Sequence, residues 1–196
     1  MRRLVAAALG FAALALIAAL SFAVAQRGSG TAKDSQVHST IKDLMVSIID
    51  PSADELWGAV GTVLDKDDGL IETFPKTEEE WLDVRHAAVR IIEGSNLLMT
   101  PGREAAPPGT KSETPGVELE PPEITTLING NRSSFDGFSA ALRGLGWEAL
   151  QASEAKNAAS LMDIGGRMQE VCEGCHQTFW YPNASTPQSG EQPSNP

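Results

Sequence analysis

The sequence has little of several residue types, and each shortage narrows the kind of protein that it encodes. Only two of its 196 residues are cysteine and three are histidine. A zinc site commonly uses four such ligands in two separated pairs, which this chain does not offer. Aromatic residues make up 6% of the chain, and there is no internal repeat and no long alternation of β-branched residues. With its many alanines, the chain favours closely packed helices.

Positive charge is also scarce. Lysine and arginine number 15 against 26 aspartate and glutamate residues, which gives a formal net charge of −11. A surface of this charge repels phosphate, so no nucleic acid is expected as a partner. A partner protein with a basic docking patch is expected instead. No nucleophile with an accompanying base is recognisable, so the chain is not expected to be an enzyme.

The first 25 residues have the pattern of an export signal. A positive start at Met1–Arg3 precedes an apolar run that ends in Ala23–Val24–Ala25, a typical cleavage site. We therefore predict a bacterial signal peptide over 1–25 and a mature chain in the periplasm. The run is also close to the ~20 residues that span a bilayer, so an uncleaved inner-membrane anchor is the alternative. Cleavage would remove two arginines and no acidic residue, taking the net charge from −11 to −13.

Apolar residues recur at helical spacing in four segments, at about 34–49, 77–98, 134–155 and 157–179. Asp50–Pro51 is expected to end the first helix, and Ser52 with Glu55 to cap a short turn after it. Thr77 and Glu80 form a capping box at the start of the second helix. Together these segments predict an all-α domain over 34–181, built as an antiparallel four-helix bundle.

The remaining segments are read as connections. Residues 65–69 form an acidic turn, and 101–123 hold most of the internal prolines. We interpret 101–123 as a loosely held loop within the domain. The polar residues 182–196 are expected to be a disordered tail.

The most informative motif is Cys172–Glu173–Gly174–Cys175–His176. Residues three and four apart share a helix face, so both cysteines can reach the edge of one flat macrocycle. His176 lies one turn after Cys172 and can reach the central iron. This C-x-x-C-H spacing attaches a c-type haem, so one covalent haem c is predicted, with His176 as the proximal iron ligand.

Other uses of the two cysteines remain open at this point. A redox dithiol of the thioredoxin kind would be expected near a βαβ pattern, which is not found around Cys172 and Cys175. A simple disulfide would leave His176 unexplained. For a zinc site only His38 and His86 remain as further histidines, and neither belongs to a paired motif.

A haem motif in the last helix of a four-helix bundle resembles the class II c-type cytochromes, the group of cytochrome c-prime and cytochrome c-556. The match runs from about Asp34 to Tyr181 and is clearest from Val171 to Phe179. The family often has a basic residue soon after the motif, whereas Trp180 and Tyr181 follow here. The proline-rich segment is a further departure, as expected for a divergent member.

The resemblance implies two versions of the iron site. Members like cytochrome c-556 use a methionine of the first helix as the sixth ligand, and Met45 is the candidate here. Cytochromes c-prime leave that position open and bind small gases such as nitric oxide. In that version Leu44 and Ile48 would line the open side. Methionine also fills cores, so Met45 has a purely structural alternative.

The resulting prediction is an exported mono-haem cytochrome that passes single electrons between redox partner proteins. The alternative is a five-coordinate haem protein that binds gases, and the third reading is a haem-free redox or zinc module. Members of the family that the chain resembles often pair as homodimers, so a homodimer is one of the states considered for this chain.

Overall fold

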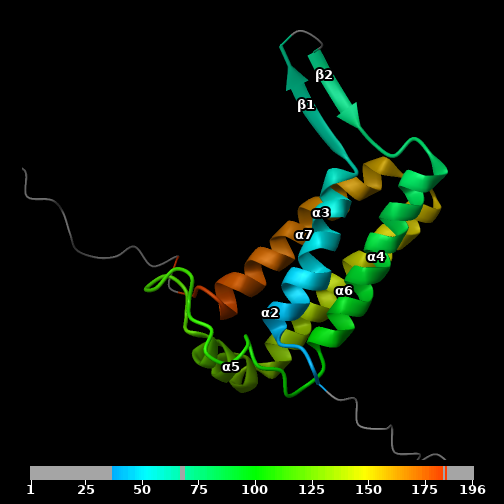
Figure 1. The fold of residues 1–196 in the computed structure, drawn as a ribbon. Coiled ribbons are helices and arrows are strands. Elements are labelled where there is room, and N and C mark those ends of the chain that lie inside the picture. The colour runs from blue at the N-terminus through cyan, green and yellow to red at the C-terminus, as the bar shows by residue number, and fades with distance from the viewer. Residues whose placement is uncertain (1–36, 67–68, 183, 185–196) are drawn as a thin grey trace, which may run out of the picture. The chain divides into compact units, whose positions relative to one another are not determined.

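The computed structural model describes residues 37–66, 69–182 and 184. The predicted signal peptide lies outside these residues, as does nearly all of the predicted tail. The described part is mostly helical with one small two-stranded sheet, which confirms the expectation of a mainly helical protein (Figure 1). None of its helices combines the length and the apolar character needed to span a membrane.

The first helical stretch begins and ends later than the predicted range 34–49, since residues 37–40 are not helical. It runs without a break through α2 (Ile41–Leu44), η1 (Met45–Ile49) and α3 (Asp50–Gly58). Thr40 caps its start in a capping box with Asp43. The prediction that Asp50–Pro51 ends the helix is wrong, because η1 is a π-helical turn that leads directly into α3.

The predicted cap at Ser52 is also wrong. Ser52 lies inside the helix, where its hydroxyl donates a 2.6 Å hydrogen bond to the carbonyl of Ile48. The same oxygen accepts a 2.9 Å hydrogen bond from Arg90 Nε, and Arg90 forms an ion pair with Glu55. The two predicted capping residues therefore fasten this helix to α4 (Glu78–Leu98).

Two short strands were not predicted. β1 (Gly61–Asp65) pairs antiparallel with β2 (Gly69–Thr73), with Val63 opposite Ile71. The strands end and begin at the bounds of the predicted acidic turn. Each has five residues and is exposed along nearly all its length, so no buried face produces the apolar alternation that would reveal it.

The other three long helices agree closely with the prediction. α4 begins after Thr77, which forms the predicted capping box with Glu80. α6 spans Arg132–Glu154 and α7 spans Ala158–Phe179. Asn157 caps α7 by accepting a 3.1 Å hydrogen bond from the amide of Ser160. These helices are long and strongly periodic, which is the pattern that sequence reveals best.

The proline-rich segment differs from its prediction in two ways. Residues 121–123 begin α5 (Pro121–Gly130), a helix that was not predicted, because proline is well tolerated in the first turn of a helix. The rest, residues 101–120, is held in place and not loose. The amide of Ile41 donates a 2.9 Å hydrogen bond to the carbonyl of Glu104, and the amide of Leu119 donates one of 2.9 Å to the carbonyl of Trp180.

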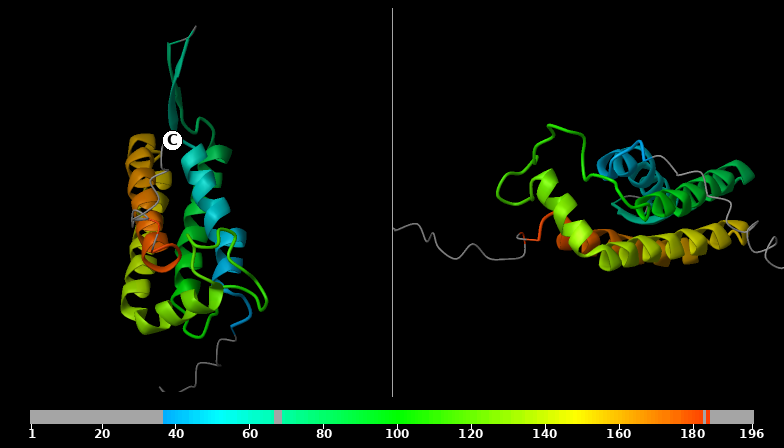
Figure 2. Two further views of the ribbon diagram at one scale, coloured as in Figure 1. Left: turned by 90° about the vertical axis from the view of Figure 1, so that its left-hand side faces the viewer. Right: turned by 90° about the horizontal axis from the view of Figure 1, so that it is seen from below.

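The long helices pack in two layers (Figure 2). α6 and α7 form one layer, and α4 with the stretch from α2 to α3 forms the other. Gly146 of α6 lets the layers meet closely, since a Cβ there would lie 2.9 Å from Ile91 Cγ2 of α4. The core between the layers is apolar, and its most deeply buried large side chains are Ile91, Ile124 and Met168.

Candidate functional site

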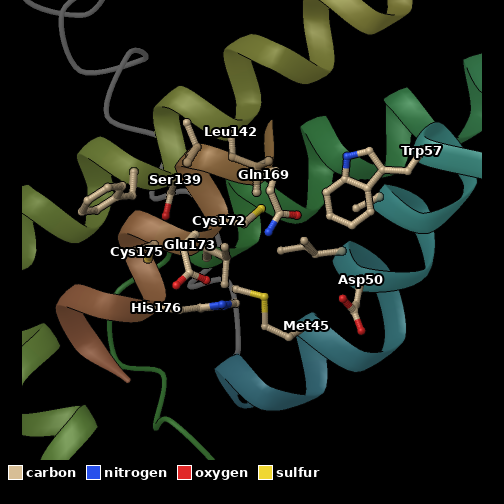
Figure 3. Close-up of a pocket in the computed structure, with 15 residues that line it drawn as sticks. Met45, Asp50, Trp57, Ser139, Leu142, Gln169, Cys172, Glu173, Cys175 and His176 are labelled. Carbon is tan, nitrogen blue, oxygen red and sulfur yellow. The ribbon is translucent and has the colours of Figure 1, made fainter. Parts of the chain in front are cut away.

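The C-terminal half of α7 carries Cys172, Cys175 and His176 along the wall of one pocket of about 250 Å³ (Figure 3). The three residues share this wall because helical residues three and four apart lie on the same face. The two cysteines are free thiols and are half-buried. The pocket opens between the two layers of helices, and most of its exposed lining is apolar. Its other lining residues are Met45, Ile49, Asp50, Ala53, Trp57, Leu98, Phe138, Ser139, Leu142, Gln169, Val171 and Glu173.

Met45 lines this pocket from the opposite layer. It belongs to the π turn η1, and Figure 3 shows its side chain directed into the same space as that of His176. The structure thus brings all four predicted site residues to one pocket. Leu44 and Ile48 line neither this pocket nor the one beside it, so their predicted place on its wall is wrong. Leu44 is instead part of the core, 3% exposed.

A second hollow of about 370 Å³ adjoins the first. Met45, Asp50 and His176 line both hollows, so they lie at the boundary between the two. The outer wall of the second hollow comes from the proline-rich segment and from the residues that follow α7. Its remaining lining residues are Lys42, Val46, Ala106, Thr110, Lys111, Ser112, Glu113, Glu118, Leu119, Pro121, Trp180 and Tyr181.

Burial controls the protonation of the motif. It raises the pKa of the Cys172 thiol to about 11 and that of Cys175 to about 12, so both are protonated at neutral pH. Burial also lowers the pKa of His176, against the smaller opposing effects of Glu173 and Asp50. His176 is therefore held as neutral imidazole, the form that binds metal ions.

A polar cluster fixes the end of α7 beside the pocket. Tyr181 Oη donates a 2.8 Å hydrogen bond to Glu173, and Gln177 Nε2 donates one of 2.7 Å to the other carboxylate oxygen. These bonds lower the pKa of Glu173. Burial and the neighbouring Glu173 carboxylate raise the pKa of Tyr181 to about 12. The cluster thereby holds the chain that carries Trp180 against the second hollow.

Aromatic rings support the motif from α6. Phe138 packs edge-on against Phe179 with ring centroids 6.4 Å apart. A Cβ at Gly174 would lie 3.2 Å from Phe138 Cε1, so the glycine inside the motif lets α7 approach this ring. The motif therefore packs against Phe138 at Gly174 and also lines the pocket.

Sequence reasoning missed part of the lining. Asp50, Trp57, Ser139 and Gln169 all reach the pocket, and no motif distinguishes them. His38 and His86 are exposed and line neither hollow. Within the described ranges, no three His, Cys, Asp or Glu side chains gather in a way that could hold a metal ion by themselves.

Comparisons of the chain with protein-family models, with curated proteins and with solved structures give no match.

Proposed function

We propose that this chain is an exported mono-haem c-type cytochrome that transfers single electrons, related to the class II cytochromes. In this proposal its helices form an antiparallel four-helix bundle around one covalent haem c. Cys172 and Cys175 hold the haem through thioether bonds, His176 is the proximal ligand, and Met45 is the sixth ligand. The observation that carries the proposal is that these four side chains line one pocket, three from α7 and one from the opposite layer.

The donor set fits a haem. A porphyrin supplies four of the iron ligands itself, so the protein needs to offer only one or two axial ligands. Neutral His176 and the thioether of Met45 are suitable, and they come from opposite layers. The apolar lining suits a largely apolar macrocycle, and the two adjoining hollows together match the size of a cofactor site.

The same properties count against the other uses of the cysteines. A redox dithiol needs a thiol whose pKa is lowered, whereas burial raises the pKa of both Cys172 and Cys175. A structural zinc site takes four protein ligands. Among the described residues, no three His, Cys, Asp or Glu side chains gather closely enough to hold a metal ion, and these include the two cysteines and His176.

When bound, a haem would supply an iron centre that gains and loses one electron. The chain sets the properties of that centre. A methionine thioether raises the reduction potential relative to an open site, and burial between helices restricts water access. The acidic surface favours a redox partner with a basic patch, and the predicted export signal favours the periplasm.

The test is expression with a haem-attachment system, followed by mass measurement and visible spectra of both oxidation states. We expect one covalent haem, and sharp low-spin bands that carbon monoxide does not change. Cys172→Ala with Cys175→Ala should abolish covalent attachment, whereas His86→Gln should leave it intact. Wild-type protein without covalent haem would refute the proposal.

The gas-binding alternative is distinguished by the same spectra. It requires an open iron, and therefore a high-spin spectrum that shifts with carbon monoxide. Met45 lines the pocket whereas Leu44 and Ile48 do not, and this observation supports the electron carrier over the gas-binding protein. Met45→Leu should convert the low-spin spectrum into the high-spin, gas-sensitive one.

A further inference from the structure

The helix that carries Met45 holds one residue more than a regular α-helix would need. In η1 the amide of Asp50 donates its hydrogen bond to the carbonyl of Met45, five residues earlier in place of four. The buried positions show the same extra residue, because the next buried residue after Leu44 is Ile49, five positions later in place of three or four. A single wide turn of this kind is rare and is frequent at functional sites.

The extra residue decides which side chain reaches the pocket. Ala53 and Trp57 line it from α3. In a regular α-helix, residues one turn apart, 3.6 positions, lie on the same face. One turn before Ala53 and two turns before Trp57 is position 50, and one turn earlier is position 46. A regular α-helix would therefore direct Val46 into the pocket. The extra residue in the wide turn rotates the residues before it by about 100° relative to α3, which is the rotation of one residue in an α-helix. Met45 therefore takes this place, and Val46 lies at the rim of the second hollow, 57% exposed.

Two residues favour the wide turn. Pro51 has no amide hydrogen, and in a straight helix its ring would clash with the carbonyl four residues earlier. On the neighbouring helix, Gly94 leaves room for the turn. A Cβ at Gly94 would lie 2.9 Å from Ile49 Cγ1 and 3.2 Å from Ile48 Cγ2.

We propose that the π turn Met45–Ile49, set between Pro51 and Gly94, is a positioning device that selects Met45 over Val46 to face His176. Its role toward the iron rests on the proposed function, whereas the placement of Met45 in the pocket does not. Pro51 and Gly94 are thus positioning residues for the sixth ligand.

The first test exchanges the two residues, combining Met45→Val with Val46→Met. The exchange conserves composition and changes only which position carries the thioether. In the haem-loaded protein we expect loss of methionine ligation, seen as a high-spin spectrum that shifts with carbon monoxide. A low-spin, gas-insensitive spectrum from the exchanged protein would mean that position 46 faces the iron, and would overturn the proposal.

The second test removes the extra residue. Deletion of Val46 together with Pro51→Ala should convert the stretch into a regular α-helix. In this regular helix Met45 lies three turns before Trp57 and on the same face, so it still points into the pocket. Leu44 keeps its place in the core. We expect the low-spin spectrum to be retained. Loss of methionine ligation in this variant, with helix content and urea midpoint close to those of the Pro51→Ala control, would contradict the proposal.

A measurement without haem separates this proposal from the proposed function. Methionine labelled with ¹³C at its ε-methyl group reports proximity through nuclear Overhauser contacts with the ring of His176. The contact is expected in wild-type protein and in the deletion variant, and not in the exchanged protein. If wild-type protein never acquires haem, the proposed function fails, and these contacts still decide the positioning proposal.

Discussion

The indole Nε1–H of Trp57 donates a 3.0 Å hydrogen bond to the carbonyl oxygen of Gly165, joining α3 to α7. A Cβ at Gly165 would lie 3.1 Å from Trp57 Cδ1, so the glycine allows this close approach. Met45 lies on the same continuous helical stretch as Trp57, and His176 on the same helix as Gly165. The contact therefore helps to fix the distance between the two proposed iron ligands.

Trp57→Phe should loosen this junction. It removes the hydrogen bond and part of a ring that lines the pocket, and we expect the free energy of unfolding to fall by about 1–2 kcal/mol. Urea unfolding of the haem-free protein measures the change. Trp147→Phe is the matched control, because Trp147 is 52% exposed and should change stability little. Equal effects of the two substitutions would show that the junction has no special role.

His176 should make the stability of the haem-free protein depend on pH. Because folding lowers the pKa of His176, the unfolded chain binds this proton more readily than the native chain does. The stabilisation is present above the unfolded value of about 6.5 and is lost as the pH falls below it. One proton can contribute at most about 1.4 kcal/mol per pH unit. Urea midpoints measured between pH 7.5 and 5.5 give this slope. This pH range lies above the range in which carboxylates commonly titrate.

His176→Gln should flatten this slope, as measured by the same urea midpoints. An identical slope in wild-type protein and in His176→Gln would assign the pH dependence to other groups.

The two thiols should react slowly in the folded, haem-free protein. Burial raises the pKa of Cys172 to about 11 and that of Cys175 to about 12, so few thiolates exist at pH 7.5. The greater nucleophilicity of a high-pKa thiolate offsets part of this effect. We expect alkylation by iodoacetamide, followed by mass spectrometry, to be at least tenfold slower than in urea. Rapid alkylation of either thiol in the folded protein would instead support a redox dithiol.

We expect Arg103 to make the main contacts that hold the proline-rich segment in place. Arg103 is 7% exposed, and its guanidinium donates 2.8 and 2.7 Å hydrogen bonds to the carbonyls of Leu97 and Ser39. Arg103→Ala should lower the free energy of unfolding by about 2–4 kcal/mol, since two hydrogen bonds from a charged donor are lost. It should also speed proteolysis within 104–119. Arg85→Ala, on the exposed side of α4, is the control, and matching proteolysis rates in the two variants would contradict this role.

Local patterns in the sequence predicted much of the helical framework. The helices α4, α6 and α7 repeat apolar residues over many turns, and α4 begins at the predicted capping box of Thr77 and Glu80. Both patterns depend only on residues that are close in the sequence, so contacts with distant parts of the chain do not alter the helices that they predict. The hairpin gave no such signal because almost all of its side chains are exposed.

The first helix shows where such reasoning fails. A constant period of 3.6 residues leads from Leu44 to Ile48, whereas the structure buries Ile49. Pro51 is compatible both with the end of a helix and with a wide turn inside one. The choice between them depends on Gly94 of another helix, which the local sequence cannot reveal.

The candidate site divides in the same way. Cys172, Cys175 and His176 are close in sequence and share a helix face by spacing alone. Met45 reaches the predicted pocket, but the residues beside it on the wall are Ile49 and Ala53, not Leu44 and Ile48. Gln169 lies three residues before Cys172 on α7, so the same spacing rule leads to it. Asp50 comes to the pocket only through packing between the layers.

Gly94→Ala should provide the most direct stability measurement of the wide turn. The new methyl group would overlap Ile49 Cγ1 at 2.9 Å, and such overpacking costs about 1–3 kcal/mol, against a gain of about 1 kcal/mol in helix propensity. The difference is a net loss of about 0–2 kcal/mol, measured by urea unfolding. Gly144→Ala, which meets no atom within 4 Å, should instead gain about 0.5–1 kcal/mol.

A third variant separates this local effect from general crowding between the layers. Gly146→Ala also overlaps an isoleucine at 2.9 Å, but its nearest neighbours are Ile91 and Ile92 of α4 and not residues of the π turn. Both crowded variants should lose stability, whereas only Gly94→Ala should shift the ε-methyl resonance of Met45. If Gly146→Ala shifts this resonance equally, the placement of Met45 depends on the packing of the whole core. If it does not, the fit of the wide turn against Gly94 controls that placement.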